Sequence, residues 1–280
     1  MPKISLILML ALAWPAIAVA DEADAHYRAG LAYKQQGKTD EAIGEFLEAI
    51  KLRKDYAAAE FSLGVVLKQR NELKPAAEHL ERAVALQPKT ADGHASLGMT
   101  YHLMGREDDA QRELEKAVEI NPNNATWQSA LGTIYRQKKD YGKAIPHLEQ
   151  AVMLDPKDAG ALSNLGVAYR QTNKVAEAEK YFLKAIEIKP DVAETHFNLA
   201  TVYRRQDKTK EAIAEYQKAI ELDRKLAAAH YDLGVLLAKE KRNDEAIDQW
   251  NQYLDLKAQQ DPKEADIVRR HIKDLGGKPH

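Results

Sequence analysis

The feature that most constrains this chain is a period of 34 residues, which runs from residue 23 to residue 260 without insertion or deletion. One column of the period is small: Gly30, Gly64, Gly98, Gly132, Gly166, Ala200 and Gly234. A second column holds only alanine: Ala42, Ala76, Ala110, Ala144, Ala178, Ala212 and Ala246. A third column is large and apolar: Phe46, Leu80, Leu114, Leu148, Phe182, Tyr216 and Trp250. An unbroken register of this length indicates a stack of equal structural units.

A single period, residues 159–192, predicts two amphipathic helices joined by a turn. Leu162, Leu165 and Tyr169 recur at three- and four-residue spacing, which places them on one helical face. After a polar break, Phe182 belongs to the apolar face of a second helix, which ends at Pro190. Small residues let two helix axes approach to about 8–10 Å. A lone helical pair cannot bury its apolar face, so each pair must stack on the next.

These residues carry a family resemblance. The pattern Leu165-Gly166-x-x-Tyr169, followed by Ala178, Phe182, Ala185 and Pro190, resembles the tetratricopeptide repeat, with Leu162 where that family usually has Trp. The resemblance implies an all-α fold, a right-handed superhelical solenoid of helix-turn-helix repeats. It divides the chain into seven tandem repeats, referred to below as repeats one to seven: 23–56, 57–90, 91–124, 125–158, 159–192, 193–226 and 227–260.

Two segments lie outside the repeats. Residues 1–20 combine Lys3, an apolar run and a small-x-small ending at Ala18-Val19-Ala20, which predicts a secretory signal peptide cleaved after Ala20. An uncleaved anchor is the alternative, although the apolar run is shorter than the roughly 20 residues of a spanning helix. Because the chain has no cysteine, we expect a bacterial periplasmic or other extracytoplasmic location. Residues 261–280 are expected to form a capping helix, with Ile267 and Val268 on one face, and a tail.

Composition argues against several classes of function. The 41 basic and 43 acidic residues give a net charge of −2, so no basic field favours nucleic acid. The absence of cysteine excludes a thiolate nucleophile, and no other catalytic constellation stands out. We therefore predict a protein that is not an enzyme, has no cofactor and does not insert into a membrane after signal cleavage.

Histidine occupies the fourth position of four repeats: His26, His94, His196 and His230. Equivalent side chains of stacked helices lie about 10 Å apart, whereas two zinc ligands each lie about 2 Å from their ion. The column is therefore better explained by half-exposed packing at the position of the family's Trp than by a metal site.

In the family that this chain resembles, positions 2, 5, 9, 12 and 13 of each first helix line a concave peptide-binding groove. The resemblance assigns to that groove a set of cationic, aromatic and amide side chains: Lys34, Lys68, Arg136, Arg170, Arg204, Arg205, Tyr27, Phe61, Phe197, Tyr231, Asn164 and Asn198. The cations have a second explanation, because position 12 is near the helix C-terminus and a positive charge there offsets the helix dipole by about 0.3–1 kcal/mol. Arginine rather than lysine in three successive repeats favours carboxylate recognition.

The sequence thus predicts an exported protein–protein interaction scaffold that binds an acidic or amphipathic peptide segment of a partner. The alternative is a structural subunit of an envelope complex for secretion, pilus assembly or polysaccharide export, held by its convex face or edges. Folds of this kind serve many unrelated partners, so the architecture leaves both open.

Overall fold

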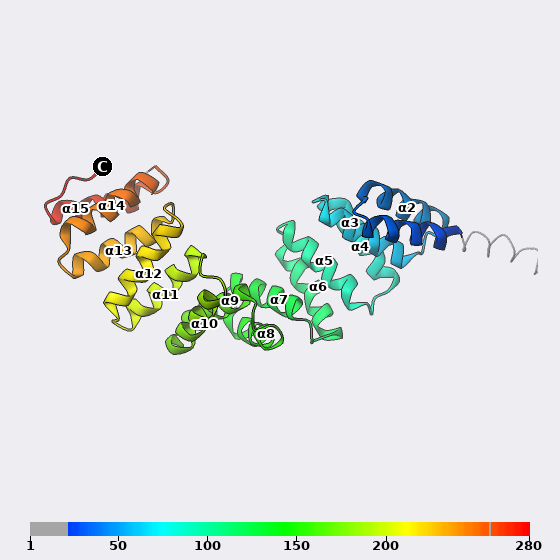
Figure 1. Cartoon of the computed structure of the whole chain (residues 1–280), viewed down its shortest axis with the longest axis horizontal. Coiled ribbons are helices and arrows are strands. Elements are labelled where there is room, and N and C mark those ends of the chain that lie inside the picture. Colours follow the sequence, from blue (N-terminus) through cyan, green and yellow to red (C-terminus); the bar gives the residue numbers. More distant parts are fainter. Residues whose placement is uncertain (1–21, 258) are drawn as a thin grey trace, which may run out of the picture. The chain divides into compact units, whose positions relative to one another are not determined.

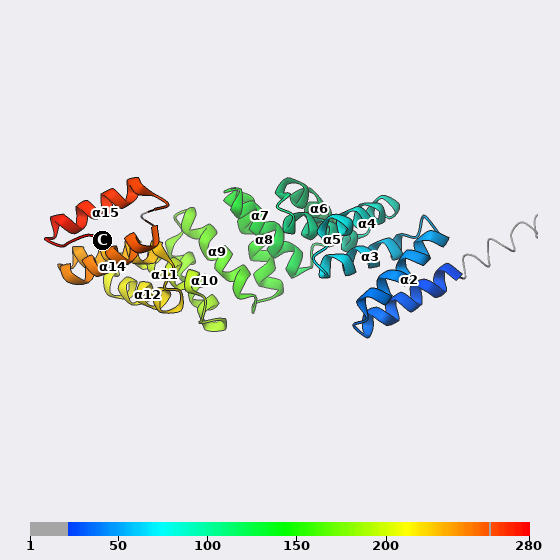
Figure 2. The same cartoon turned by 90° about the horizontal axis from the view of Figure 1, so that it is seen from above.

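The computed structural model describes residues 22–257 and 259–280, and every regular element within them is an α-helix (Figures 1 and 2). The expected signal peptide lies outside the described residues. A first helix covers residues 22–35. The helices that follow it are α2 (Thr39–Leu52), α3 (Ala57–Gln69), α4 (Leu73–Leu86), α5 (Ala91–Leu103), α6 (Glu107–Ile120), α7 (Ala125–Gln137), α8 (Tyr141–Leu154), α9 (Ala159–Gln171), α10 (Val175–Ile188), α11 (Ala193–Arg205), α12 (Thr209–Leu222), α13 (Ala227–Lys239), α14 (Asn243–Lys257) and α15 (Pro262–Asp274). None of the described helices is long and apolar enough to cross a membrane.

The chain is an all-α solenoid of helical hairpins that divides into two compact units between Ile134 and Tyr135. Within each unit, the first helix of a repeat packs on the second helix of the same repeat, as α3 does on α4. The second helix then packs on the first helix of the next repeat, as α4 does on α5. This alternation buries each apolar face between two neighbours, which a single hairpin could not do.

The core consists of the three columns that recur every 34 residues. All seven residues of the alanine column have no exposed surface, and the large column from Phe46 to Tyr216 is equally buried. The small column lies against the large one: a Cβ added at Gly166 would be 2.8 Å from Cε1 of Phe182. Glycine at this column therefore sets how closely the two helices of a repeat approach.

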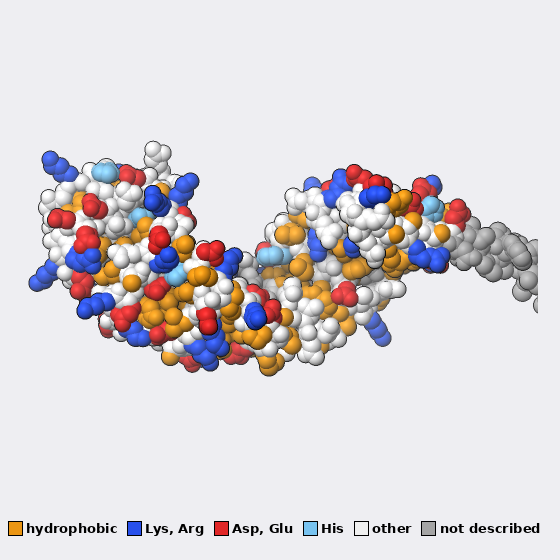
Figure 3. Space-filling view, in the orientation of Figure 1, with side chains coloured by type: hydrophobic (Ala, Val, Ile, Leu, Met, Phe, Trp, Pro, Cys, Tyr) orange, Lys and Arg blue, Asp and Glu red, His pale blue; other side chains and the backbone are white. Residues whose placement is uncertain are grey.

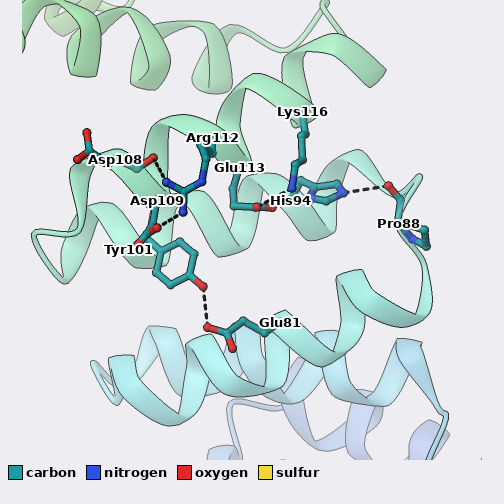
Figure 4. Close-up of polar contacts among 9 residues, drawn as sticks. All are labelled: Glu81, Pro88, His94, Tyr101, Asp108, Asp109, Arg112, Glu113 and Lys116. Carbon is teal, nitrogen blue, oxygen red and sulfur yellow. Dashed lines mark hydrogen bonds and ion pairs between the residues drawn. The ribbon is translucent and has the colours of Figure 1, made fainter.

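Three of the four histidines at the fourth position are buried, contrary to the expectation of half-exposed packing, whereas His26 is half-buried as expected. His94, His196 and His230 are each 4–5% exposed, and both ring nitrogens of each are hydrogen-bonded. In repeat three, Nδ1 of His94 lies 2.6 Å from Oε2 of Glu113 and Nε2 lies 2.9 Å from the carbonyl oxygen of Pro88 (Figure 4). The ring thus ties the second helix of its repeat to the turn before the first. We call this arrangement the ring clamp.

Charge reinforces the ring clamp of repeat three. Burial acts to raise the pKa of Glu113, but hydrogen bonds from Lys116 and His94 outweigh it, so the pKa lies below its ordinary value. His196 repeats the arrangement with Glu215 at 2.6 Å and the carbonyl of Pro190 at 2.9 Å. The side chain of Gln128 reaches the carbonyl of Pro122 at 2.8 Å from the same position in repeat four.

Repeat two holds the same pair of residue types in reversed order. Glu60 stands at the histidine position and is 1% exposed, and its Oε2 lies 2.6 Å from Nδ1 of His79. Arg82 adds two hydrogen bonds to the same carboxylate, at 2.8 and 3.1 Å. Where a carboxylate and a histidine occupy these two sites, the fold therefore accepts either order.

Neighbouring repeats are also joined by a tyrosine. The hydroxyl of Tyr101 donates to Oε1 of Glu81 at 2.6 Å, from repeat three to repeat two (Figure 4). Tyr169 makes the equivalent bond to Glu149 in the second unit. Burial and this hydrogen bond raise the pKa of both phenols, which keeps them protonated as donors.

Turns between the helices of a repeat need one residue with positive φ. Gly37, Asn71, Gly105 and Asn173 take this conformation, as expected for helix stops. Lys139, Asp207 and Lys241 take it as well, with φ between 55° and 62°, although their side chains disfavour it. The turn geometry of the repeat thus outweighs the local preference of these three residues.

Helix α15 covers the last apolar face of the second unit. Ala265, Val268 and Ile272 are buried and join the core formed by α12, α13 and α14. Ile267 is 40% exposed, contrary to the prediction that it shares a face with Val268. Adjacent residues on a helix point about 100° apart, and the buried set follows the three- and four-residue spacing that excludes Ile267.

Candidate functional site

Four cations at the C-terminal ends of first helices are half-buried and have no partner among the described residues. They are Lys34 on the helix over residues 22–35, Lys68 on α3, Arg136 on α7 and Arg170 on α9. Lys34 and Lys68 belong to the first unit, and Arg136 and Arg170 to the second. We call these four residues the unpaired cations.

The environment of two of the unpaired cations, Lys68 and Arg170, disfavours their charge. Burial lowers the pKa of Lys68. Burial, followed by the nearby positive charge of Arg205, lowers the pKa of Arg170. The Nε atoms of Arg136 and Arg170 are buried without a hydrogen-bond acceptor. An offset of the helix dipole explains a charge at this position, but it does not explain why these charges are desolvated and unpaired.

Arg204 and Arg205 do not continue this set, so the predicted strip of equivalent arginines is divided. Nη1 of Arg204 lies 2.8 Å from Oδ1 of Asp232, a carboxylate that also accepts a hydrogen bond from Tyr216 at 3.3 Å. Arg205 is exposed and donates from Nη1 to the carbonyl oxygen of Arg170 at 2.9 Å. Arg204 is therefore neutralised within the unit, while Arg205 stays on the surface beside Arg170.

Three of the four predicted aromatic residues line cavities, and all four are half-buried. Tyr27 and Phe61 line a cavity of about 140 Å³ in the first unit, and Tyr231 lines one of about 530 Å³ in the second. Phe197 packs on the buried ring of Tyr216, with 5.7 Å between ring centroids. Of the predicted asparagines, Asn198 is 4% exposed, so it belongs to the interior.

Asn164 lines a third cavity, of about 300 Å³, in the second unit. It is surrounded by residues of the first helix, the end of the second helix and the start of the next repeat: Ala159, Gly160, Ser163, Ala185, Lys189, Val192, Glu194 and Thr195. The 140 Å³ cavity has the same place in repeat two. Lys189, Glu194 and Thr195 were not predicted as site residues. The available signal was Gly160, the smallest residue in its column, together with Ser163 in a column that is aromatic in four other repeats.

The face drawn in Figure 3 shows no large basic patch. Acidic and basic side chains alternate over the face drawn in Figure 3, in keeping with the net charge of −2. Within the described residues, no group of three metal-ligating side chains could hold an ion. What the site offers chemically is a few desolvated positive charges and nearby cavities, which suits binding of a segment with carboxylates rather than catalysis.

A family model described as the cilia and flagella-associated protein 70 C-terminal domain matches residues 10–234. The chain belongs to this family of tetratricopeptide-repeat proteins. Among solved structures, the tetratricopeptide-repeat protein YrrB, described as having an unusual peptide-binding site, is 24% identical over 66% of this chain and 95% of that chain, with a TM-score of 0.61.

A chain of the APC/C hetero-tetramer Cut9–Hcn1 is 17% identical to the present chain. The match covers 88% of the present chain and 48% of the Cut9–Hcn1 chain, with a TM-score of 0.62. MamA from Desulfovibrio magneticus RS-1 is 23% identical over 61% of this chain and 96% of its own, with a TM-score of 0.56. These likenesses establish the fold. No curated protein matches the sequence.

Proposed function

We propose that the protein is a non-catalytic scaffold that binds an acidic segment of a partner protein on the first helices of its repeats. The observation that carries this proposal is the set of unpaired cations: Lys34, Lys68, Arg136 and Arg170 are half-buried, and no described carboxylate pairs with any of them. A carboxylate brought by a ligand would form charge-assisted hydrogen bonds with groups that are already partly desolvated, which makes each contact stronger than one in water.

The comparisons support this proposal at the level of the family. YrrB is described as having a peptide-binding site, and the Cut9–Hcn1 chain belongs to a hetero-tetramer, so proteins of the same fold bind peptides and other chains. Arginine at positions 136 and 170 adds a planar fork that suits bidentate contact with a carboxylate.

Charge reversal in the second unit tests the proposal. The probes are peptides of about twelve residues that carry several glutamates, several lysines or neither, and binding is measured by fluorescence anisotropy. We expect the double variant Arg136→Glu, Arg170→Glu to bind the acidic peptide at least tenfold more weakly, because one charge-assisted contact contributes about 1.5–3 kcal/mol.

The control is Lys210→Glu, Lys225→Glu, which changes the net charge equally at two exposed lysines of the same unit. It should weaken binding less than twofold in about 150 mM salt, where separated surface charges are screened. Circular dichroism must show unchanged helicity in both variants. Equal weakening in both would mean non-specific attraction, and absence of binding by the wild type would overturn the proposal in favour of a structural subunit held by other surfaces.

We also propose export, on the strength of the leader-like residues 1–20. Expressed in a bacterium from the full-length sequence, the protein is expected in the periplasmic fraction with Asp21 as its first residue, as determined by intact mass. A cytoplasmic protein that retains Met1 to Ala20 would contradict this.

A further inference from the structure

The cavities of repeats two and five each lie on the same first helix as an unpaired cation. Phe61 of the cavity wall and Lys68 are seven residues apart on α3, and Ser163 and Arg170 are seven residues apart on α9. Seven residues make two helical turns, so each pair faces the same way, about 10 Å apart along the axis. In a polyproline II segment, with three residues per turn, side chains three positions apart lie on the same side and about 9 Å from each other.

We propose that each unit recognises a two-point pattern in a polyproline II segment of a partner protein: an acidic residue and, three positions away, a side chain that enters the cavity. The proposal rests on the proposed function and adds to it a spacing and a second residue class. The unpaired cation binds the acidic residue, and the residues around the cavity decide which side chain is accepted.

In the first unit the cavity selects an aliphatic side chain. Its walls are the rings of Tyr27 and Phe61, and Ala57, Ala58 and Ala83 also line it. The ring of Tyr27 is held in place by Phe46 and Tyr56, with centroids 5.9 and 5.1 Å away. A volume of about 140 Å³ suits one leucine- or isoleucine-sized group, whose full burial is worth about 1.5–3 kcal/mol.

In the second unit the equivalent cavity is larger and polar. The hydroxyls of Ser163 and Thr195 lie 3.4 Å apart, and the amide of Asn164 also lines the cavity. Lys189 and Glu194 are both present, so their charges offset each other. These groups donate and accept hydrogen bonds without net charge, which fits a glutamine or asparagine side chain.

A partner protein is a better occupant than the tail of this chain. The C-terminal residues are bonded to α14: the amide of His280 donates to Asn251, and Asn251 donates to the carbonyl of Lys278. The tail therefore lies against the end of the second unit. The unpaired positive charges favour a ligand that brings carboxylates, which a neutral tail segment would not supply.

The substitution Ser163→Phe tests the proposal within the full chain. Phenylalanine occupies the same repeat position in Phe61 and Phe197, so the helix accepts it, and here it would narrow the cavity and remove the hydroxyl of Ser163 from its wall. The probes are short peptides in a Gly-Ser-Thr background with one glutamate and, one to four positions away, a glutamine, a leucine or an alanine. We expect wild-type affinity to be highest at a spacing of three.

We expect the wild type to bind the peptide with glutamine at least fivefold more tightly than the peptide with alanine. Ser163→Phe should abolish this preference. It should change the affinity for the peptide that carries glutamate and alanine by less than twofold. Phe61→Ser should abolish the preference for leucine in the same way. Affinity that does not depend on spacing, or a glutamine preference that survives Ser163→Phe, would overturn the two-point pattern. Failure of the proposed function is distinct, because then no acidic peptide would bind or Arg136→Glu, Arg170→Glu would have no effect.

Discussion

Replacing His94 by Glu, or Glu113 by His, is expected to lower the free energy of unfolding of the first unit by about 3 kcal/mol. The first change places two carboxylates side by side, and the second removes the carboxylate that His94 and Lys116 contact. The double exchange His94→Glu, Glu113→His should recover at least half of this loss. It reproduces the order found in repeat two, where Glu60 and His79 pair at 2.6 Å. Lys116 then stands where repeat two has Arg82, and can reach the new carboxylate.

Urea denaturation followed by circular dichroism measures the effect. The control is the exposed pair Glu48 and Lys51 of α2, whose side chains are 47% and 72% exposed. Exchanging these two residues, singly or together, should change stability by less than about 0.5 kcal/mol. If the double exchange at His94 and Glu113 is no more stable than the single variants, the ring clamp depends on its carbonyl contact or on shape rather than on charge complementarity.

Gly98→Ala is expected to destabilise the first unit by about 2 kcal/mol, even though alanine is the better helix former. A Cβ at this position would lie 2.9 Å from Cγ of Leu114 and 3.1 Å from two backbone atoms, the carbonyl oxygen of Ala110 and the nitrogen of Leu114. A side chain can rotate away from such a contact, but helix backbone cannot, so α5 and α6 must separate. Thermal or urea denaturation detects the loss.

Gly44→Ala in α2 is the matched control. It makes the same chemical change inside a helix, but nothing lies within 4 Å of the added Cβ. We expect it to stabilise the unit by about 0.5–1 kcal/mol through helix propensity alone. Equal effects at the two positions would show that the close approach at Gly98 does not limit the packing of α5 on α6.

Much of the fold could be predicted from the sequence because one pattern is repeated. The alanine and large columns lie in the buried core, and Gly37, Asn71, Gly105 and Asn173, whose residue types accept positive φ, take it at the turns. The sequence did not indicate that Lys139, Asp207 and Lys241 take this conformation too, because their own preferences oppose it. Their place in the repeat decides the outcome.

Less of the candidate site could be predicted. Arg136, Arg170 and Arg204 are equivalent in charge and repeat position. Of these three, only Arg204 is paired with a carboxylate in the described part of the chain, that of Asp232, which lies 28 residues later. Asn198 was placed on the same surface as Asn164, but it is 4% exposed and belongs to the interior. Exposure and pairing depend on what the next repeat presents, and that differs from one repeat to another.

The sequence by itself determined the period, the helical hairpins and the buried columns, because these depend on spacing along one helix and on residue size. Tertiary structure decided the ring clamps, the cavities and which cations lack a partner. In the ring clamp of repeat three, His94 contacts Glu113, 19 residues later, and the carbonyl of Pro88, six residues earlier. Tyr101 donates a hydrogen bond to Glu81, 20 residues earlier. Such contacts form only when helices stack at a fixed distance and rotation, so no local pattern specifies them.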